Sequence, residues 1–154
     1  MRTIAVDPGR GGAIALLHRD VLVAVVDMPI MPDRAIDVWT LARYVEDLIG
    51  DESLPTFVLE EPPFMPDQAN QMTKGRDMGR VEATLARFTT TIIPARPPVW
   101  KRHHGLIKQP KDASRELALE LWPAAEPLLA RKGDVDRAEA ALIGRWAWDT
   151  GLVE

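Results

Sequence analysis

The first thirty residues constrain the fold most, because three short β-prone runs are joined there by tight breaks. Apolar residues run from Thr3 to Val6, the glycine-rich stretch DPGRGG interrupts them, and a second apolar run extends from Ala13 to Leu17. Asp20 marks the next break, and Val21 to Val26 forms a third β-rich run. Strands joined by turns this short pair antiparallel. The chain is therefore predicted to open with an antiparallel meander.

Helices and strands are expected to alternate downstream of this meander. The predicted elements are a helix over 36–49, a strand over 57–59, a helix over 79–88, a strand over 89–93, and helices over 113–121 and 137–148. A strand, helix and strand in succession favour a parallel unit. The sequence thus predicts an α/β fold with a central five-stranded mixed sheet flanked by helices, in a single domain over residues 1–154.

Composition restricts the chemistry and the partners. The chain has no cysteine and 3 histidines, so any divalent ion would be held mostly by carboxylates. Oxygen ligands prefer hard cations, and Mg²⁺ is therefore the expected ion. The formal net charge of −4 requires any nucleic-acid binding to rest on local basic patches. No signal-peptide core or membrane-spanning apolar stretch is expected, which predicts a cytoplasmic protein without a membrane partner.

Carboxylates stand at separate places where a strand ends or a helix begins. Asp7 follows the first strand, Glu60 follows the strand over 57–59, and Asp136 and Glu139 open the last helix. Clustered carboxylates repel one another, and two divalent ions would neutralise them while binding phosphate oxygens. Two-metal hydrolysis of a phosphodiester is the chemistry that needs this arrangement.

Each of these acids also has a purely structural interpretation. Asp7 could be a turn former in Asp-Pro-Gly, and Glu60 could be a solvated strand end. Asp136 and Glu139 have the spacing of a helix capping box. Glu61 and Asp134 are neighbouring alternatives to the assigned ligands. Spacing alone leaves these interpretations open.

Four motifs taken together carry a family resemblance. In order along the chain they are IAVDPGRGGAIALL, VLEEPPFMPDQ, Trp100-Lys101-Arg102 with KDASRELALELWP, and DRAEAALIGRWA. Their order and spacing resemble the phage-type RuvC-like Holliday junction resolvases over nearly the whole chain. The resemblance implies a ribonuclease-H-like fold, a homodimer with two active sites, and paired symmetric nicks in a four-way DNA junction that leave 5′-phosphate and 3′-hydroxyl ends.

The resemblance also implies a site. It makes Asp7, Glu60, Asp136 and Glu139 the metal ligands of a two-ion centre that uses Mg²⁺, with Mn²⁺ as the alternative. Glu139 stands where many bacterial members carry Asp, which makes this position a departure from the usual pattern.

Basic residues are expected to contact DNA. The resemblance places Lys101 and Lys111 near the scissile phosphate, where they would stabilise developing negative charge; two solvated lysines are the alternative. The segment from Gln68 to Arg80 resembles the junction-facing loop and following helix of the family. The predicted DNA-binding residues are Lys74, Arg76, Arg80, Lys101, Arg102, His103, His104, Lys108 and Lys111.

Large apolar side chains near these segments are predicted to pack rather than to bind. Phe64, Met65 and Met72 could wedge between bases at a junction, but packing of the core or of a loop is the preferred role. The tryptophans at positions 122, 146 and 148 recur inside apolar helical stretches and are predicted to pack helices together.

Three other functions compete with junction resolution. Another ribonuclease-H-like nuclease could act on RNA–DNA hybrids or simple branched DNA, because an acidic core does not encode substrate shape. An ATPase or sugar-kinase-like domain also opens on a glycine-rich phosphate loop, but the chain is too short for its two lobes. A non-catalytic scaffold is disfavoured by the presence of all four acids.

Overall fold

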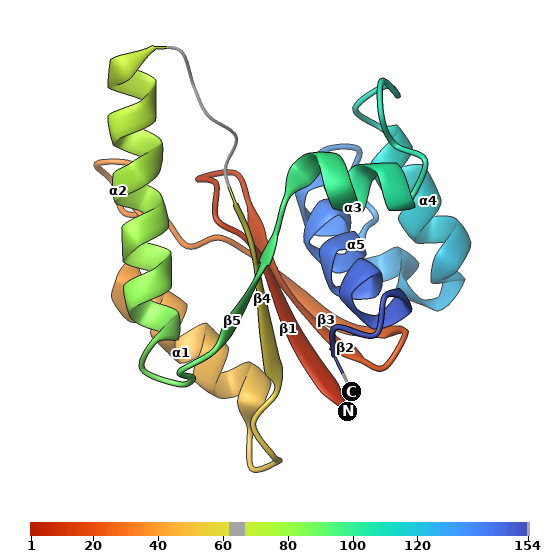
Figure 1. Cartoon of the computed structure of the whole chain (residues 1–154), viewed down its shortest axis with the longest axis horizontal. Coiled ribbons are helices and arrows are strands. Elements are labelled where there is room, and N and C mark those ends of the chain that lie inside the picture. The colour runs from red at the N-terminus through yellow and green to blue at the C-terminus, as the bar shows by residue number, and fades with distance from the viewer. Residues whose placement is uncertain (62–66, 154) are drawn as a thin grey trace.

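A mixed five-stranded sheet forms the centre of the computed structural model, which describes residues 1–61 and 67–153 (Figure 1). The spatial order is β3-β2-β1-β4-β5. The first three strands are antiparallel neighbours, β4 lies parallel to β1, and β5 lies parallel to β4. The strands are β1 Arg2–Asp7, β2 Ala13–His18, β3 Val21–Asp27, β4 Thr56–Glu60 and β5 Ile92–Ala95.

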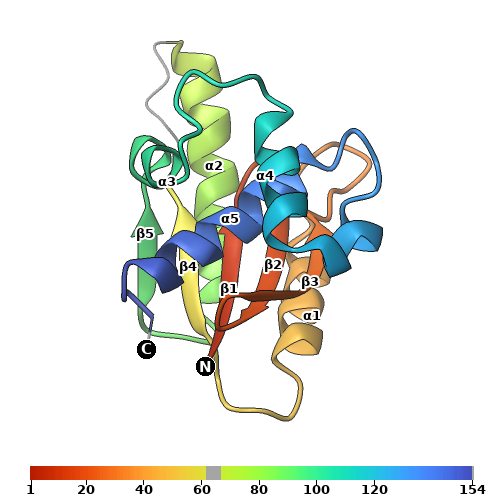
Figure 2. The same ribbon diagram turned by 90° about the vertical axis from the view of Figure 1, so that its right-hand side faces the viewer.

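Helices cover both faces of the sheet. Two lie on one face and the others on the opposite face, and α5 crosses β1, β2 and β4 (Figures 1 and 2). The first pair is α1 Val38–Ile49 and α2 Gln68–Leu85. The second group is α3 Pro97–His103, α4 Ala113–Leu121, the short 3₁₀ helix η1 Pro123–Leu128 and α5 Val135–Asp149. A hydrophobic core fills each of the two interfaces.

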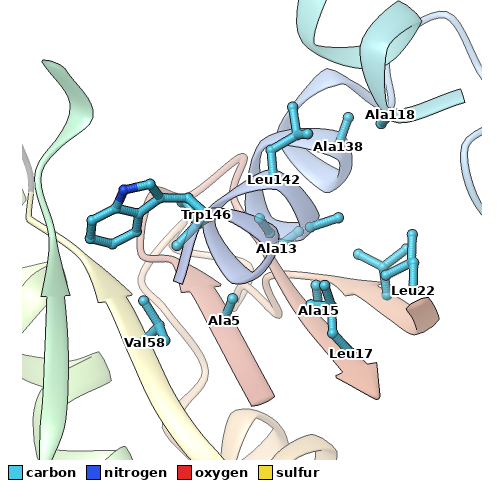
Figure 3. Close-up of a cluster of buried hydrophobic side chains, with 14 of the residues drawn as sticks. Ala5, Ala13, Ala15, Leu17, Leu22, Val58, Ala118, Ala138, Leu142 and Trp146 are labelled. Atoms are coloured by element: carbon cyan, nitrogen blue, oxygen red, sulfur yellow. The ribbon is translucent and has the colours of Figure 1, made fainter. Parts of the chain in front are cut away.

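The alternation of side chains along the strands explains the two cores. Ile4 and Val6 point toward α1 and α2, whereas Ala5 points toward α5. Small side chains on the α5 face allow this helix to approach the sheet closely (Figure 3). At the closest point, a Cβ added to Gly144 would lie 2.4 Å from Leu17 Cδ1 and 3.2 Å from Ala5 Cβ.

Replacing Gly144 with alanine is therefore expected to destabilise the protein by about 1–3 kcal/mol, the usual cost of overpacking a core. Urea denaturation followed by circular dichroism measures this free energy. Gly79→Ala is the matched control, because a Cβ at Gly79 in α2 would meet no atom within 4 Å. The control should be neutral or stabilising through helix propensity. Equal effects of the two substitutions would show that α5 does not approach the sheet this closely.

Most of the predicted elements are confirmed. The antiparallel meander, the strand that ends at Glu60 and the parallel unit of β4, α2 and β5 are all present. The helix predicted over 113–121 has those bounds, and the first and last helices differ from their predicted bounds by two residues or fewer at each end. The α/β mixed sheet with flanking helices is thus confirmed.

Two predictions about local structure were wrong. The helix expected at Gly79 begins at Gln68, where Asp67 caps it by accepting from the backbone N–H of Ala69. Residues 67–76 are exposed, so this part of the helix has no apolar face to reveal its period. The strand expected over 89–93 runs from Ile92 to Ala95, and it includes Pro94 because β5 is an edge strand. The following basic segment forms the unpredicted helix α3.

The packing predictions had mixed outcomes. Trp122 and Trp146 are buried and Trp148 packs partly buried against the same core, as predicted. The prediction that Met72 packs against the core or a loop was wrong, because this residue of α2 is 68% exposed. Phe64 and Met65 lie outside the described residues. None of the described helices has the length and apolar character needed to cross a membrane.

Candidate metal centre

Three carboxylates from opposite ends of the chain meet at one edge of the sheet. Asp7 is the last residue of β1, and Asp136 and Glu139 lie one turn apart near the start of α5. Each offers an oxygen, and these oxygens all lie within 4.8 Å of one another. The structure therefore brings together three of the four predicted ligands at a spacing that suits a metal ion.

The glycine-rich turn after β1 shapes the surroundings of Asp7. The backbone N–H of Gly9 donates to Asp7 Oδ1 at 3.1 Å and fixes the carboxylate. A Cβ added at Gly11 would lie 3.2 Å from Asp136 Oδ2, so this position keeps the space into which Asp136 projects. Burial, together with the charges of Asp136 and Glu139, raises the pKa of Asp7 to about 6 despite the hydrogen bond.

Glu60 lies beside this cluster at the end of β4, the parallel neighbour of β1. The buried indole of Trp100 donates from Nε1 to Glu60 Oε1 at 2.9 Å. Burial and the nearby charge of Asp7 raise the pKa of Glu60 to about 8. Asp7 and Glu60 also line one cleft of about 270 Å³. The fourth predicted ligand thus borders the site, although it is not one of the three whose oxygens lie within 4.8 Å.

Two side chains hold Glu139 in place. Lys101 Nζ lies 3.1 Å from Glu139 Oε1, and Ser114 Oγ donates to the same oxygen at 3.0 Å. Lys111 lines an adjacent cleft with these residues, and its charge lowers the pKa of Asp136, which burial raises overall. Both predicted lysines therefore lie near the carboxylates. Ser114, a buried polar residue of α4, was missed from the sequence.

The alternative ligands have other partners. Asp134 is buried and accepts from the backbone N–H and the guanidinium of Arg131 at 2.8 and 2.7 Å. Glu61 forms an ion pair with Arg96 at 3.0 Å. Asp134 also occupies the cap position of α5, so the capping-box interpretation of Asp136 does not hold. Both alternative acids therefore have partners outside the cluster of Asp7, Asp136 and Glu139.

An ion-pair network fixes the beginning of α5 against the sheet. Arg137 donates to both carboxylate oxygens of Asp27, at 2.5 and 2.9 Å, and to the carbonyl of Leu128 at 3.0 Å. Arg131 adds a contact to Asp27 at 3.1 Å. Arg137 lies between Asp136 and Glu139 in the sequence, so the network anchors the turn of α5 that carries both acids. Sequence reasoning missed its ion pairs, since Asp27 is more than 100 residues from both arginines.

The predicted DNA-binding residues do not form one group. Lys74 lines the 270 Å³ cleft beside Asp7 and Glu60. Arg76 and Arg80 line neighbouring clefts along α2, whereas Arg102 and Lys108 are exposed on and after α3. His103 and His104 instead contact α5. Their Nε2 atoms lie 3.1 Å from Asp149 Oδ2 and 2.8 Å from the carbonyl of Leu142, and burial lowers the pKa of His104.

This donor set fits a hard divalent cation. The ligand atoms are carboxylate oxygens, which Mg²⁺, Mn²⁺ and Ca²⁺ prefer over softer metals. Burial is the largest cause of the raised pKa values of Asp7 and Glu60, and repulsion from the neighbouring carboxylates adds to it. A bound cation would remove this repulsion. The site therefore has the composition and the electrostatics of a metal centre.

The chain combines the fold of RuvC with a cluster of carboxylates. The whole chain aligns with a Thermus thermophilus RuvC structure at a TM-score of 0.64 and 15% identity, covering 99% of that protein. It aligns with T. thermophilus RuvC in complex with a Holliday junction substrate at 0.60 and 16%, covering 98%. At these identities the likeness shows the fold.

One curated relative is similar in sequence. A stretch of 96 residues, 58% of the chain, is 35% identical to the chloroplastic Holliday junction resolvase MOC1 of Chlamydomonas reinhardtii. The match spans 10% of that longer protein. No family model matches the chain.

Proposed function

We propose that the chain is a metal-dependent DNA endonuclease that resolves four-way junctions. The observation that carries this proposal is the meeting of Asp7, Asp136 and Glu139 at the edge of a sheet with the RuvC fold. The junction as substrate is supported by MOC1, a Holliday junction resolvase in part similar to this chain, and by the junction substrate in the RuvC complex.

Asp7, Asp136 and Glu139 would hold the metal, with Glu60 completing the site from β4. We propose Mg²⁺ as the ion, with Mn²⁺ as the alternative and two ions per site. When bound, the ions supply positive charge to the phosphate and polarise the attacking water. The reaction adds water to phosphorus and breaks the P–O3′ bond, which gives a 5′-phosphate and a 3′-hydroxyl.

The protein's own residues orient these acids and balance their charge. The Gly9 N–H fixes Asp7, Trp100 fixes Glu60, and Ser114 fixes Glu139. Lys101 is held against Glu139, where its ammonium adds positive charge beside the site. We propose that Lys101 and Lys111 stabilise the negative charge that develops on the scissile phosphate.

The finer features of this proposal rest on the order of the four sequence motifs. They are membership in the phage-type branch, a homodimer with two active sites, and symmetric paired nicks. Contacts of the DNA backbone with Lys74, Arg76, Arg80, Arg102, His103, His104 and Lys108 also belong to the proposal. The cytoplasmic location stays a prediction.

A substrate panel tests the proposed activity. Purified protein is incubated with labelled four-way junction, linear duplex and RNA–DNA hybrid, in Mg²⁺, Mn²⁺ or EDTA. We expect paired nicks in the junction that require a metal and that Asp136→Asn removes. Asp51→Asn is the control, because Asp51 is an exposed acid in the turn between α1 and β4. Preferential cutting of the hybrid would favour a ribonuclease H activity, and binding without cutting would make the acids structural.

A further inference from the structure

A second polar cleft continues from the metal centre along α2. It has a volume of about 190 Å³ and lies between the glycine-rich turn, the loop around residue 33 and the helix. Three guanidinium groups line it, from Arg10, Arg76 and Arg80. It shares Arg10, Thr73 and Asp77 with the 270 Å³ cleft that contains Asp7 and Glu60. The two clefts therefore adjoin, and together they are called the groove.

Arg10 is held in this groove by a buried acid. Arg10 Nε donates to Asp77 Oδ2 at 2.7 Å, and the Asp77 side chain is only 8% exposed. This contact leaves the two terminal nitrogens of Arg10 without a hydrogen bond to any described residue. Asp77 therefore orients the guanidinium through Nε, while the two terminal nitrogens stay available to a ligand.

The other oxygen of Asp77 is incompletely satisfied. Asp77 Oδ1 is buried and has no hydrogen-bond partner in the part of the chain that the structure describes. Arg80 Nη1 lies 3.7 Å from this oxygen, an ion pair too long for a hydrogen bond. Unpaired buried carboxylate oxygens are costly. The second cleft is thus bordered by a buried acid that Arg10 satisfies only in part.

Charge changes sign along the groove. In the first cleft, the acids Asp7, Glu60 and Asp77 outnumber the cations Arg10 and Lys74. In the second cleft, Arg76 and Arg80 join the shared Arg10, and the two acids that line it, Asp33 and Asp77, leave an excess of positive charge. Guanidinium groups match the planar, bidentate geometry of phosphate oxygens. The second cleft therefore suits an anion of phosphate size.

We propose that Arg10, oriented by Asp77, binds with Arg76 and Arg80 a backbone phosphodiester of the DNA strand whose scissile phosphate lies at the metal centre. The roles of Arg10 and Asp77 go beyond the proposed function. The path of the DNA strand rests on that proposed function. Asp77 is a positioning residue here, and Arg10 is a binding residue.

The test is the salt dependence of DNA binding. Affinities of the wild type, Arg10→Gln, Asp77→Leu and Arg43→Gln are measured in EDTA at several salt concentrations, on a four-way junction and on a single strand of the same sequence. Arg10→Gln should weaken binding about tenfold and reduce the slope of log K against log salt by about one, as expected for one lost phosphate contact. Arg43→Gln changes an exposed arginine of α1 and should match the wild type.

Asp77→Leu separates positioning from simple electrostatics. It removes a negative charge from the groove, so charge alone predicts tighter binding, whereas the proposal predicts weaker binding because Arg10 loses its support. Melting curves establish that each variant is folded. The proposal is overturned if Arg10→Gln behaves as Arg43→Gln does, if Asp77→Leu binds more tightly, or if the wild type binds neither DNA. Cleavage in Mg²⁺ is measured separately. Binding that depends on Arg10 but is not followed by cutting would refute the proposed nuclease activity and support phosphate binding in the second cleft.

Discussion

Replacing Asp7 with asparagine is expected to abolish junction cleavage, by about 10³-fold or more, and at the same time to stabilise the metal-free protein. Asparagine keeps the shape of the side chain and an oxygen that can accept from the Gly9 N–H. It removes one of the three charges that would hold the metal. Loss of a ligand removes the charge stabilisation that metal catalysis supplies.

The sign of the stability change follows from the pKa of Asp7. The ordinary value is 3.8, and burial with the neighbouring carboxylates raises it to about 6 in the folded chain. A carboxyl whose pKa is higher in the folded state binds its proton more tightly there. Stability from this group is therefore fully present below about pH 4 and is lost as the pH rises through about 6.

At pH 8 in EDTA, Asp7→Asn should accordingly be more stable than the wild type by about 1–3 kcal/mol, since each pKa unit is worth about 1.4 kcal/mol. Adding Mg²⁺ should raise the melting temperature of the wild type and have a smaller effect on the variant. Asp51→Asn, at an exposed acid between α1 and β4, is the control. If Asp7→Asn is less stable than the wild type, Asp7 does not carry an unfavourable charge in the metal-free protein. If Mg²⁺ stabilises the variant as much as the wild type, Asp7 is not a ligand of the metal.

The candidate site was largely predictable because its acids stand at element ends. Asp7 and Glu60 end strands that prove to be parallel neighbours, and such ends meet at the same edge of a sheet. Asp136 and Glu139 lie one turn apart on a helix, so either both or neither could reach that edge. The side chains that support them could not be predicted. Trp100 and Ser114 acquire their roles only when α3 and α4 pack beside the acids.

The fold shows the same division between local and long-range information. The meander was predictable because each of its strands carries an apolar run and each turn carries its own breaker residues. The N-terminal half of α2 was not, because exposed residues from Gln68 to Arg76 leave no hydrophobic period to detect. The exposure of Met72 follows from the same projection of α2 beyond the sheet.

Substituting Trp100 with phenylalanine is expected to impair cleavage by about 10–100-fold, the usual cost of losing a partner that orients a metal ligand. The indole N–H of Trp100 lowers the pKa of Glu60, which nevertheless stands at about 8 because burial is the larger effect. Without this hydrogen bond the pKa should rise further. At pH 7 the carboxyl would then hold its proton more tightly against an incoming cation, so the pH–rate profile should shift to higher pH.

Trp122→Phe is the matched control for this effect. Trp122 is also buried and also donates its indole N–H, but to the backbone carbonyl of Asp20, away from the acids. Both variants lose a buried hydrogen bond and some packing, so both should be destabilised by about 1–3 kcal/mol. Only Trp100→Phe should move the pH–rate profile and weaken the response to Mg²⁺. If the two variants lose activity equally and keep the wild-type profile, Trp100 supports only the core, and Glu60 does not take part in binding the metal through this contact.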